Sequence, residues 1–288
     1  MKEKLEYIIV KSLLWIFSFL PKKTLYATTW FIAMLFFRFG TKRRKLTLAN
    51  LKLAFDDKST KEIYELAKKC YENIGITVAE IILMLQNRID LDTLINNKTQ
   101  ALNQLQELTK DAKHGAIFVT AHFSNWELGA LFLAKNGYPM TAIGRAGNNT
   151  YIEKTLTTPF RQKFGSTNVH KDNAILKIVK TLKTGGYAGL LIDQKAGGGM
   201  SMQARFFGMA ADTTTSVAML KLKYNPRIIP LFLTRENDGT YTIRITTCKR
   251  GADATLESLT QEYNDILEAV IRTYPEQWFW MHNRWRIA

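Results

Sequence analysis

A histidine and a glutamate stand five positions apart at the boundary between two predicted elements. Residues 116–120 form an apolar run that predicts a strand, and residues 128–135 repeat apolar side chains with the period of a helix. Positions five apart on a regular helix differ by about 140° in direction, so His122 and Glu127 can meet only if His122 lies in the turn and Glu127 in the first helical turn. In that arrangement His122 could act as a general base on a substrate hydroxyl, while Glu127 fixed the imidazole tautomer and stabilised the imidazolium.

The same residues also have a structural interpretation. Ser124 and Glu127 have the spacing of a capping box, in which Glu127 would bond a backbone N–H at the start of the helix. His122 would then be a structural histidine at the end of a strand. Both interpretations stay open, because Glu127 could bond the backbone with one oxygen and His122 with the other.

Polar residues follow two further predicted strands, at the carboxyl ends where ligands of α/β sheets tend to bind. After the strands expected at 140–144 and 187–192 come Arg145, Asn148 and Asn149, and Asp193, Gln194 and Lys195, respectively. We expect these groups to converge with His122 on one edge of the sheet.

Several common kinds of site are excluded by their missing sequence patterns. The chain has no G-x-S-x-G, H-E-x-x-H or G-x-x-x-x-G-K-[ST] motif, and no G-x-G-x-x-G after a strand. Its two cysteines, Cys70 and Cys248, are far apart and have no metal-ligand neighbours, so the sequence predicts neither a disulfide framework nor a metal site.

The order of apolar patterns predicts the architecture. Ser59 and Glu62 form a capping box before a long helix, and a polar helical region follows at 90–112. From there, strands expected at 116–120, 140–144, 187–192, 228–233 and 241–246 alternate with helices expected at 125–135, 150–163, 173–184, 213–224 and 256–274. This alternation predicts an α/β domain with a largely parallel sheet. We therefore expect a catalytic domain over 46–288, with a helical lead-in at 59–112 and an α/β core at 115–288.

The first 45 residues predict a membrane anchor. Two apolar stretches, 7–20 and 25–39, are each shorter than the roughly 20 residues of a spanning helix. We expect them to enter or lie in the membrane interface, with a single tilted span or a buried helical hairpin as alternatives. The basic cluster at 41–45 would contact anionic headgroups and favours the cytoplasmic side.

The net charge of +15 predicts an acidic partner: nucleic acid, an anionic membrane surface, or an acidic or phosphorylated substrate. Residues 1–45 hold ten Lys or Arg against two Glu, which is +8 of the total. This concentration favours membrane lipids over nucleic acid. A non-catalytic membrane or nucleic-acid binder, suggested by the charge and the aromatic, basic tail at 278–286, would instead bury His122 without a cleft.

The segment 122–127, His-Phe-Ser-Asn-Trp-Glu, resembles the His-x4-Glu signature of the bacterial lipid A biosynthesis acyltransferases, which add lauroyl or myristoyl chains. Further similar blocks follow in the family's order, at 144–149, 192–194, 205–208, 212–215 and 275–285. The resemblance covers about residues 115–286, and the apolar N-terminal segment stands where this family has its membrane anchor. It implies an α/β fold like that of glycerol-3-phosphate acyltransferases.

The resemblance also implies the reaction: transfer of a fatty acyl chain from an acyl carrier protein thioester to the hydroxyl of an acyl chain on a lipid A precursor. No cofactor is implied, and the enzyme would work as a monomer on the cytoplasmic face of the inner membrane. The family's functional arginine and aspartate correspond to Arg161 and Asp193. Arg145 or Arg161 would bind phosphate or the thioester oxyanion, Asp193 would organise the site, and Asn149 and Gln194 would support the substrate.

The sequence departs from the family pattern in two places. Residues 145–150 lack both prolines of the family's Arg-Pro-x-x-Asn-Pro, so we expect a less rigid loop. Lys195 follows Gln194 where the family tends to have His-Asp or Gln-Asp after the strand-end aspartate, so donor or acceptor preference is expected to differ. The alternative within the superfamily is an enzyme that uses acyl-coenzyme A to acylate another glycolipid, such as a phosphatidylinositol mannoside.

Overall fold

The computed structural model describes residues 1–288 except 145–146, 170–173, 197–198, 250, 252 and 288. Its centre is a six-stranded sheet with the strand order β3-β2-β4-β1-β7-β8. In that order the strands are Thr167–Val169, Met140–Ile143, Tyr187–Leu191, Ala116–Thr120, Arg227–Arg235 and Tyr241–Ile245. The first five run parallel, and β8 is antiparallel to β7. The predicted α/β fold with a largely parallel sheet is confirmed.

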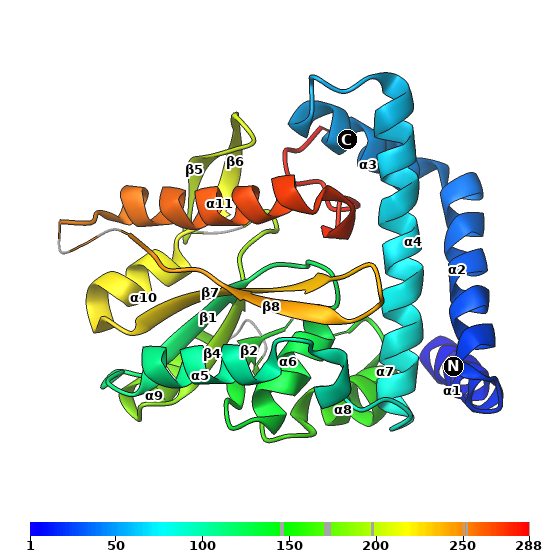
Figure 1. Ribbon diagram of the computed structural model, residues 1–288, viewed down its shortest axis with the longest axis horizontal. Helices are drawn as coiled ribbons and strands as arrows, with labels where there is room; N and C mark the ends of the chain where they lie inside the picture. The colour runs from blue at the N-terminus through cyan, green and yellow to red at the C-terminus, as the bar shows by residue number, and fades with distance from the viewer. Residues whose placement is uncertain (145–146, 170–173, 197–198, 250, 252, 288) are drawn as a thin grey trace.

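Helices cover both faces of this sheet (Figure 1). Helices α5 (Lys98–Thr109), α6 (Trp126–Lys135) and α8 (Thr158–Gln162) pack with one set of alternating strand residues, which includes Phe118. Helices α9 (Ala174–Lys183), α10 (Ser216–Tyr224) and α11 (Leu256–Thr273) pack with the other set, which includes Val119. Covering both faces explains why β1 reads as a continuous apolar run rather than an alternating one.

The N-terminal third is helical: α1 (Lys2–Ser18), α2 (Lys22–Phe39), α3 (Thr41–Ala54) and α4 (Thr60–Leu85). The predicted capping box begins α4, with Ser59 accepting from the N–H of Glu62 and Glu62 accepting from the N–H of Ser59. Helix α2 packs along α4 (Figure 1). Gly75 of α4 permits this approach, because a Cβ there would lie 3.0 Å from the carbonyl oxygen of Thr29.

The two N-terminal helices differ in how much they bury. Helix α2 buries one stripe, Leu25, Thr29, Ala33 and Phe37, whereas α1 has no buried residue. Among the described residues, no helix combines the length and the apolarity needed to cross a membrane.

Some predicted elements are shorter or broken. The helix expected at 150–163 consists of α7 (Thr150–Ile152), a π-helical turn (Glu153–Thr157) and α8. The polar region at 90–112 holds a short 3-10 turn (Asp92–Leu94) before α5, and a second 3-10 turn (Pro275–Gln277) follows α11. The helix expected from residue 213 begins only at Ser216, because the preceding residues form a strand.

That strand belongs to a hairpin outside the main sheet, made of β5 (Ser201–Phe206) and β6 (Met209–Thr214). The sequence pattern predicts neither this hairpin nor the three-residue strand β3. The two-residue turn of the hairpin has positive φ at both positions, 53° at Phe207 and 75° at Gly208, as a type I′ turn requires. Phenylalanine rarely adopts that conformation, so the sequence carries a weak turn signal here.

Candidate active site

Two neighbouring strands bring His122 and Asp193 together. Strands β1 and β4 are paired so that Thr120 lies opposite Leu191, and each side chain follows two residues later. The imidazole Nδ1 of His122 lies 2.9 Å from Oδ1 of Asp193. The other carboxylate oxygen accepts a hydrogen bond of 2.9 Å from the indole N–H of Trp278. The predicted convergence at this sheet edge therefore holds for His122 and Asp193.

Asp193 is ionised in this setting. Burial raises the pKa of its carboxyl group, but the neighbouring imidazole and the hydrogen bonds from His122 and Trp278 outweigh burial and hold the pKa below its ordinary value. A carboxylate beside Nδ1 favours the tautomer with the proton on Nδ1, which leaves Nε2 as the proton acceptor. Gln194 Nε2 lies 3.4 Å from that nitrogen.

Glu127 has a different partner from the one expected. It binds Arg161, whose Nε lies 3.1 Å from both carboxylate oxygens and whose terminal nitrogen lies 2.5 Å from one of them. The orientation of the imidazole, predicted for Glu127, thus falls to Asp193. Glu127 projects from the first turn of α6 as predicted, but toward α8 rather than toward the strand end.

The ion pair of Glu127 and Arg161 reaches solvent. Burial lowers the pKa of Arg161. Hydrogen bonding and charge attraction with Glu127 raise it by more than burial lowers it, so the net shift of the pKa is upward. The arginine side chain is 35% exposed and the glutamate 10%. A cation held by Glu127 therefore lines the same cavity as His122.

The capping-box interpretation of Ser124 is wrong. Asn125 is the N-cap of α6, and its Oδ1 accepts from the N–H of Leu128 at 3.0 Å. Ser124 precedes the cap with φ of 51°, a left-handed conformation. His122 and Glu127 therefore lie on opposite sides of this turn, and His122 bonds Asp193 while Glu127 bonds Arg161.

One predicted substrate contact, Asn149, is not brought to this site. Asn149 caps α7 by accepting from the N–H groups of Tyr151 and Ile152, and its amide donates to the carbonyl of Glu3 and to the carboxylate of Glu6. Its side chain thus fastens α1 to α7. Arg145 lies outside the described residues.

A cavity of about 610 Å³ opens at His122, Glu127, Arg161 and Gln194. It continues along the face of the sheet that α6 covers, where its lining is mostly apolar. That lining includes Phe118, Gly129, Ala130, Leu133, Met140, Ala142, Gly189, Leu191, Leu231 and Leu233. A cleft at His122 is the opposite of what a non-catalytic binder predicts, and its form suits a long apolar group with a polar end.

The C-terminal segment completes the site, a role that the sequence pattern does not predict. The carbonyl of His122 accepts from the N–H of Phe279 at 3.0 Å, and the N–H of Ser124 donates to the carbonyl of Gln277 at 2.6 Å. Trp278 is 2% exposed and anchors Asp193. Trp278 packs in the core, but nothing in the local sequence points to Asp193 as its partner.

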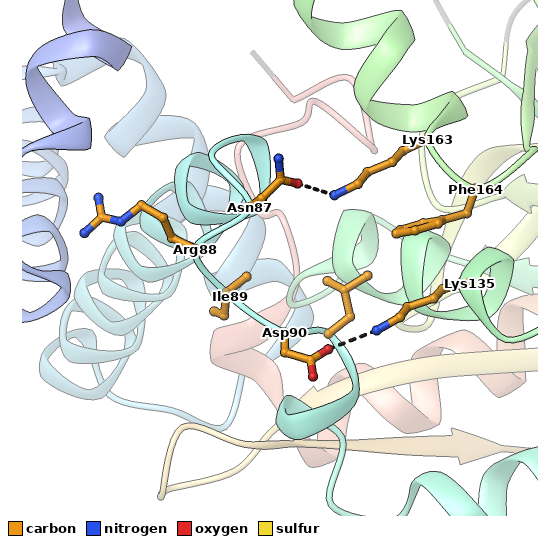
Figure 2. Close-up of a pocket in the computed structure, with 8 residues that line it drawn as sticks. Asn87, Arg88, Ile89, Asp90, Lys135, Lys163 and Phe164 are labelled. Atoms are coloured by element: carbon orange, nitrogen blue, oxygen red, sulfur yellow. Dashed lines mark hydrogen bonds and ion pairs between the residues drawn. The ribbon is translucent and has the colours of Figure 1, made fainter.

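A second hollow of about 360 Å³ lies at the end of α4, between Asn87, Asp90, Lys135, Lys163 and neighbours (Figure 2). Its lysines are engaged, because Lys135 pairs with Asp90 at 3.0 Å and Lys163 donates to Asn87. The guanidinium of Arg88 points away from the hollow and bonds carbonyls at the end of α1. We therefore assign the chemistry to the strand-end cavity.

Comparison with known proteins agrees with this geometry. The model of a family described as bacterial lipid A biosynthesis acyltransferase matches residues 2–287. The chain is 26% identical over 286 residues to a lipid A biosynthesis lauroyltransferase of Escherichia coli (strain K12), covering 96% of this chain and 89% of the relative. It is 25% identical over 284 residues to a lipid A biosynthesis palmitoleoyltransferase of the same strain, with the same coverage. A lipid A biosynthesis acyltransferase 2 of Shigella flexneri is 25% identical over 252 residues, covering 85% of this chain and 78% of the relative.

Proposed function

The chain belongs to the family of bacterial lipid A biosynthesis acyltransferases and is an acyltransferase, and from this premise we propose that it moves a fatty acyl chain from an acyl carrier protein thioester to a hydroxyl of a lipid A precursor. The observation that carries the proposal is the His122 and Asp193 pair at the mouth of an apolar cavity. The acceptor hydroxyl would belong to an acyl chain already on the precursor.

His122 would act as the general base. Its Nε2 takes the proton of the acceptor hydroxyl while the hydroxyl oxygen attacks the thioester carbonyl, and Asp193 stabilises the imidazolium that forms. The tetrahedral intermediate then collapses: the carbon–sulfur bond breaks, the ester remains, and the imidazolium returns the proton to the leaving thiolate. No metal or cofactor is needed for this balance.

Arg161 would supply the positive charge of the site. Its guanidinium lines the cavity and is fixed by Glu127, which suits it to bind a phosphate of the acceptor or the developing oxyanion of the thioester. Glu127 would therefore act on Arg161, and only indirectly on His122.

The donor can be tested by competition between two thioesters with the same acyl chain. We expect kcat/KM for the acyl carrier protein thioester to exceed that for the coenzyme A thioester by about 10-fold or more at low salt, because a chain of net charge +15 steers an acidic protein over a wide surface. Added salt should reduce the difference. Equal or better use of the coenzyme A thioester would contradict the proposed donor and favour the alternative enzyme class.

The apolar part of the cavity would hold the acyl chain. It follows β1 from His122 back to Phe118, which is about 13 Å at the usual rise of a strand. Gly189 keeps this space open on β4, and a Cβ there would lie 3.0 Å from the flexible Sδ of Met140.

Gly189→Val should shift donor preference toward shorter chains, because the added carbons enter the cavity. We expect the rate with a long donor to fall at least about 10-fold relative to a shorter one, because a single methylene in an apolar pocket already has an effect of that size and valine adds three carbons. Acyl transfer is measured with a series of saturated donors. Ala188→Gly, a change on the opposite face of β4, is the control and should alter stability only. An unchanged chain-length profile in Gly189→Val would place the acyl chain elsewhere.

Helices α1 and α2 would dock the enzyme on the membrane interface at the cytoplasmic face of the inner membrane. Exposed apolar side chains gather on α1 and α2: Leu5, Ile8, Ile9, Leu13, Trp15, Ile16, Phe19, Trp30, Phe31, Phe36 and Phe39. Such a surface is typical of helices that lie in the headgroup region. Helix α1 is fastened to α7 through Asn149, so the docked surface would adjoin the elements that lead to Arg161.

Trp15→Ala combined with Phe19→Ala should weaken vesicle binding, since each removes an exposed apolar side chain (65% and 69% exposed). Flotation with vesicles that contain anionic lipid measures the bound fraction, which we expect to fall several-fold. Leu176→Ala, an equally exposed position on α9, is the control. Equal binding by all three proteins would contradict docking through α1.

A further inference from the structure

A buried polar cluster lies directly behind the turn that carries His122. Its centre is Glu80 of α4, which is 2% exposed. One carboxylate oxygen of Glu80 accepts from Asn125 at 2.8 Å, from Arg235 at 3.0 Å and from the hydroxyl of Tyr241 at 2.5 Å. Three elements of the core, α4, β7 and β8, thus meet the turn at a single atom.

Asn125 connects this cluster to the site because its two amide atoms face different ways. Its Nδ2 donates to Glu80, and its Oδ1 caps α6 by accepting from Leu128. The cap fixes the first turn of α6, which carries Glu127. The position of Glu80 is therefore transmitted to Glu127 through one fully buried side chain.

The other side of the turn is held by the same cluster. The side chain of Gln277 accepts from the backbone N–H of Arg235 at 2.8 Å and donates to its carbonyl at 2.9 Å. The carbonyl of Gln277 in turn accepts from Ser124. Arg235 thus links the ion pair with Glu80 to the backbone that pins the turn.

The turn needs such support. Ser124 is in a left-handed conformation that serine seldom adopts, and its hydroxyl is buried without a hydrogen-bond partner among the described residues. A backbone of this kind persists only where its surroundings determine it. A buried ion pair is a weak source of stability but can specify a single arrangement.

We propose that Glu80 is a positioning residue for acyl transfer: through Asn125 it holds the turn so that His122 meets Asp193 and Glu127 meets Arg161. The inference rests on the proposed roles of His122 and Arg161. Glu80 itself does not line the cavity, so its effect on the reaction passes through the turn.

Exchanging the two polar groups tests the proposal. Asn125→Asp keeps a good N-cap but sets a second carboxylate against Glu80. We expect kcat to fall about 100-fold with little change in KM, as for a small displacement of reacting groups. Adding Glu80→Gln restores an amide and a carboxylate in exchanged positions, and should return kcat to within about 10-fold of the wild type. An unchanged kcat in Asn125→Asp, or no recovery in the double variant, would overturn the proposal.

A second variant decides the matter if Asn125→Asp does not fold. Asn125→Ser also keeps a good cap but has no amide to donate to Glu80. A lower kcat at unchanged KM would support the proposal, and a wild-type kcat would overturn it. Asn97→Ser is the matched control, because Asn97 is the N-cap residue of α5 and bonds the backbone of Ile243, and neither residue lines the cavity. It should lower stability without lowering kcat.

The same assay separates this inference from the proposed function. Full turnover by His122→Ala would contradict the proposed base. An inactive His122→Ala together with no recovery in the exchanged double variant would contradict only the positioning role of Glu80.

Discussion

His122→Ala is expected to lower kcat for acyl transfer by about 1,000-fold, because it removes the group that takes the hydroxyl proton. KM should change little, since the cavity lining is otherwise intact. The variant should fold, because the His122 side chain is 26% exposed and its main hydrogen bond is to a single carboxylate. Initial rates in detergent, with an acyl carrier protein thioester and a lipid A precursor, measure the effect.

His114→Ala is the matched control. His114 is an exposed histidine just before β1, so its loss should leave kcat unchanged. If His122→Ala kept turnover within a factor of a few of the wild type while His114→Ala did the same, the reaction would not depend on a base at the strand end.

Asp193→Asn should lower kcat by up to about 10,000-fold, the loss seen when a catalytic histidine loses the carboxylate that orients it. The new amide can accept a hydrogen bond from the N–H at Nδ1 only through its oxygen. If its NH2 group faces Nδ1 instead, it donates to that nitrogen and favours the tautomer that carries the proton on Nε2. That tautomer cannot accept a proton from the acceptor hydroxyl. Asp238→Asn, in an exposed loop, is the control and should keep the wild-type kcat.

The same variant makes a prediction about stability and pH. The pKa of Asp193 is lowered in the folded protein, so its carboxylate stabilises the fold above the unfolded pKa of about 3.9, and this contribution is lost as the pH falls through the folded value. The free energy of unfolding of Asp193→Asn should therefore lie below that of the wild type at pH 7, with the gap closing in acid. Denaturant unfolding at several pH values measures it. A gap that stayed constant down to strong acid would contradict a carboxylate with a lowered pKa.

Much of the candidate site follows from the rule that ligands of α/β sheets tend to bind beyond the carboxyl ends of the strands. His122 and Asp193 each follow an apolar run that was predicted within a residue or two, and parallel strands in register bring such positions together. The elements around them have the expected order because their apolar patterns are long and regular. The short strand β3 and the hairpin of β5 and β6 lack such patterns.

The pairing of side chains could not be read from spacing. His122 and Glu127 are near in sequence, yet their partners lie 71 and 34 residues away, in β4's end loop and in α8. The direction of Glu127 is set by the cap at Asn125 and the left-handed Ser124, and neither is visible in a spacing rule. Tertiary packing decided these contacts.

The buried residues that support the candidate site are the hardest to predict from the sequence. Trp278 reaches Asp193 across 85 residues and Glu80 reaches Asn125 across 45. A glutamate within a long helix reads as solvated charge unless its partners are known. Only the arrangement of α4, β7 and β8 around the turn reveals its role.

Mass spectrometry of the lipid product shows whether this chain esterifies a hydroxyl of a lipid A precursor with His122 as the base. Purified wild-type protein, given an acyl carrier protein thioester and the precursor, should yield a lipid heavier by one ester-linked acyl chain, and His122→Ala should yield almost none. Absence of this lipid with the wild type, or equal amounts from both proteins, would contradict the claim.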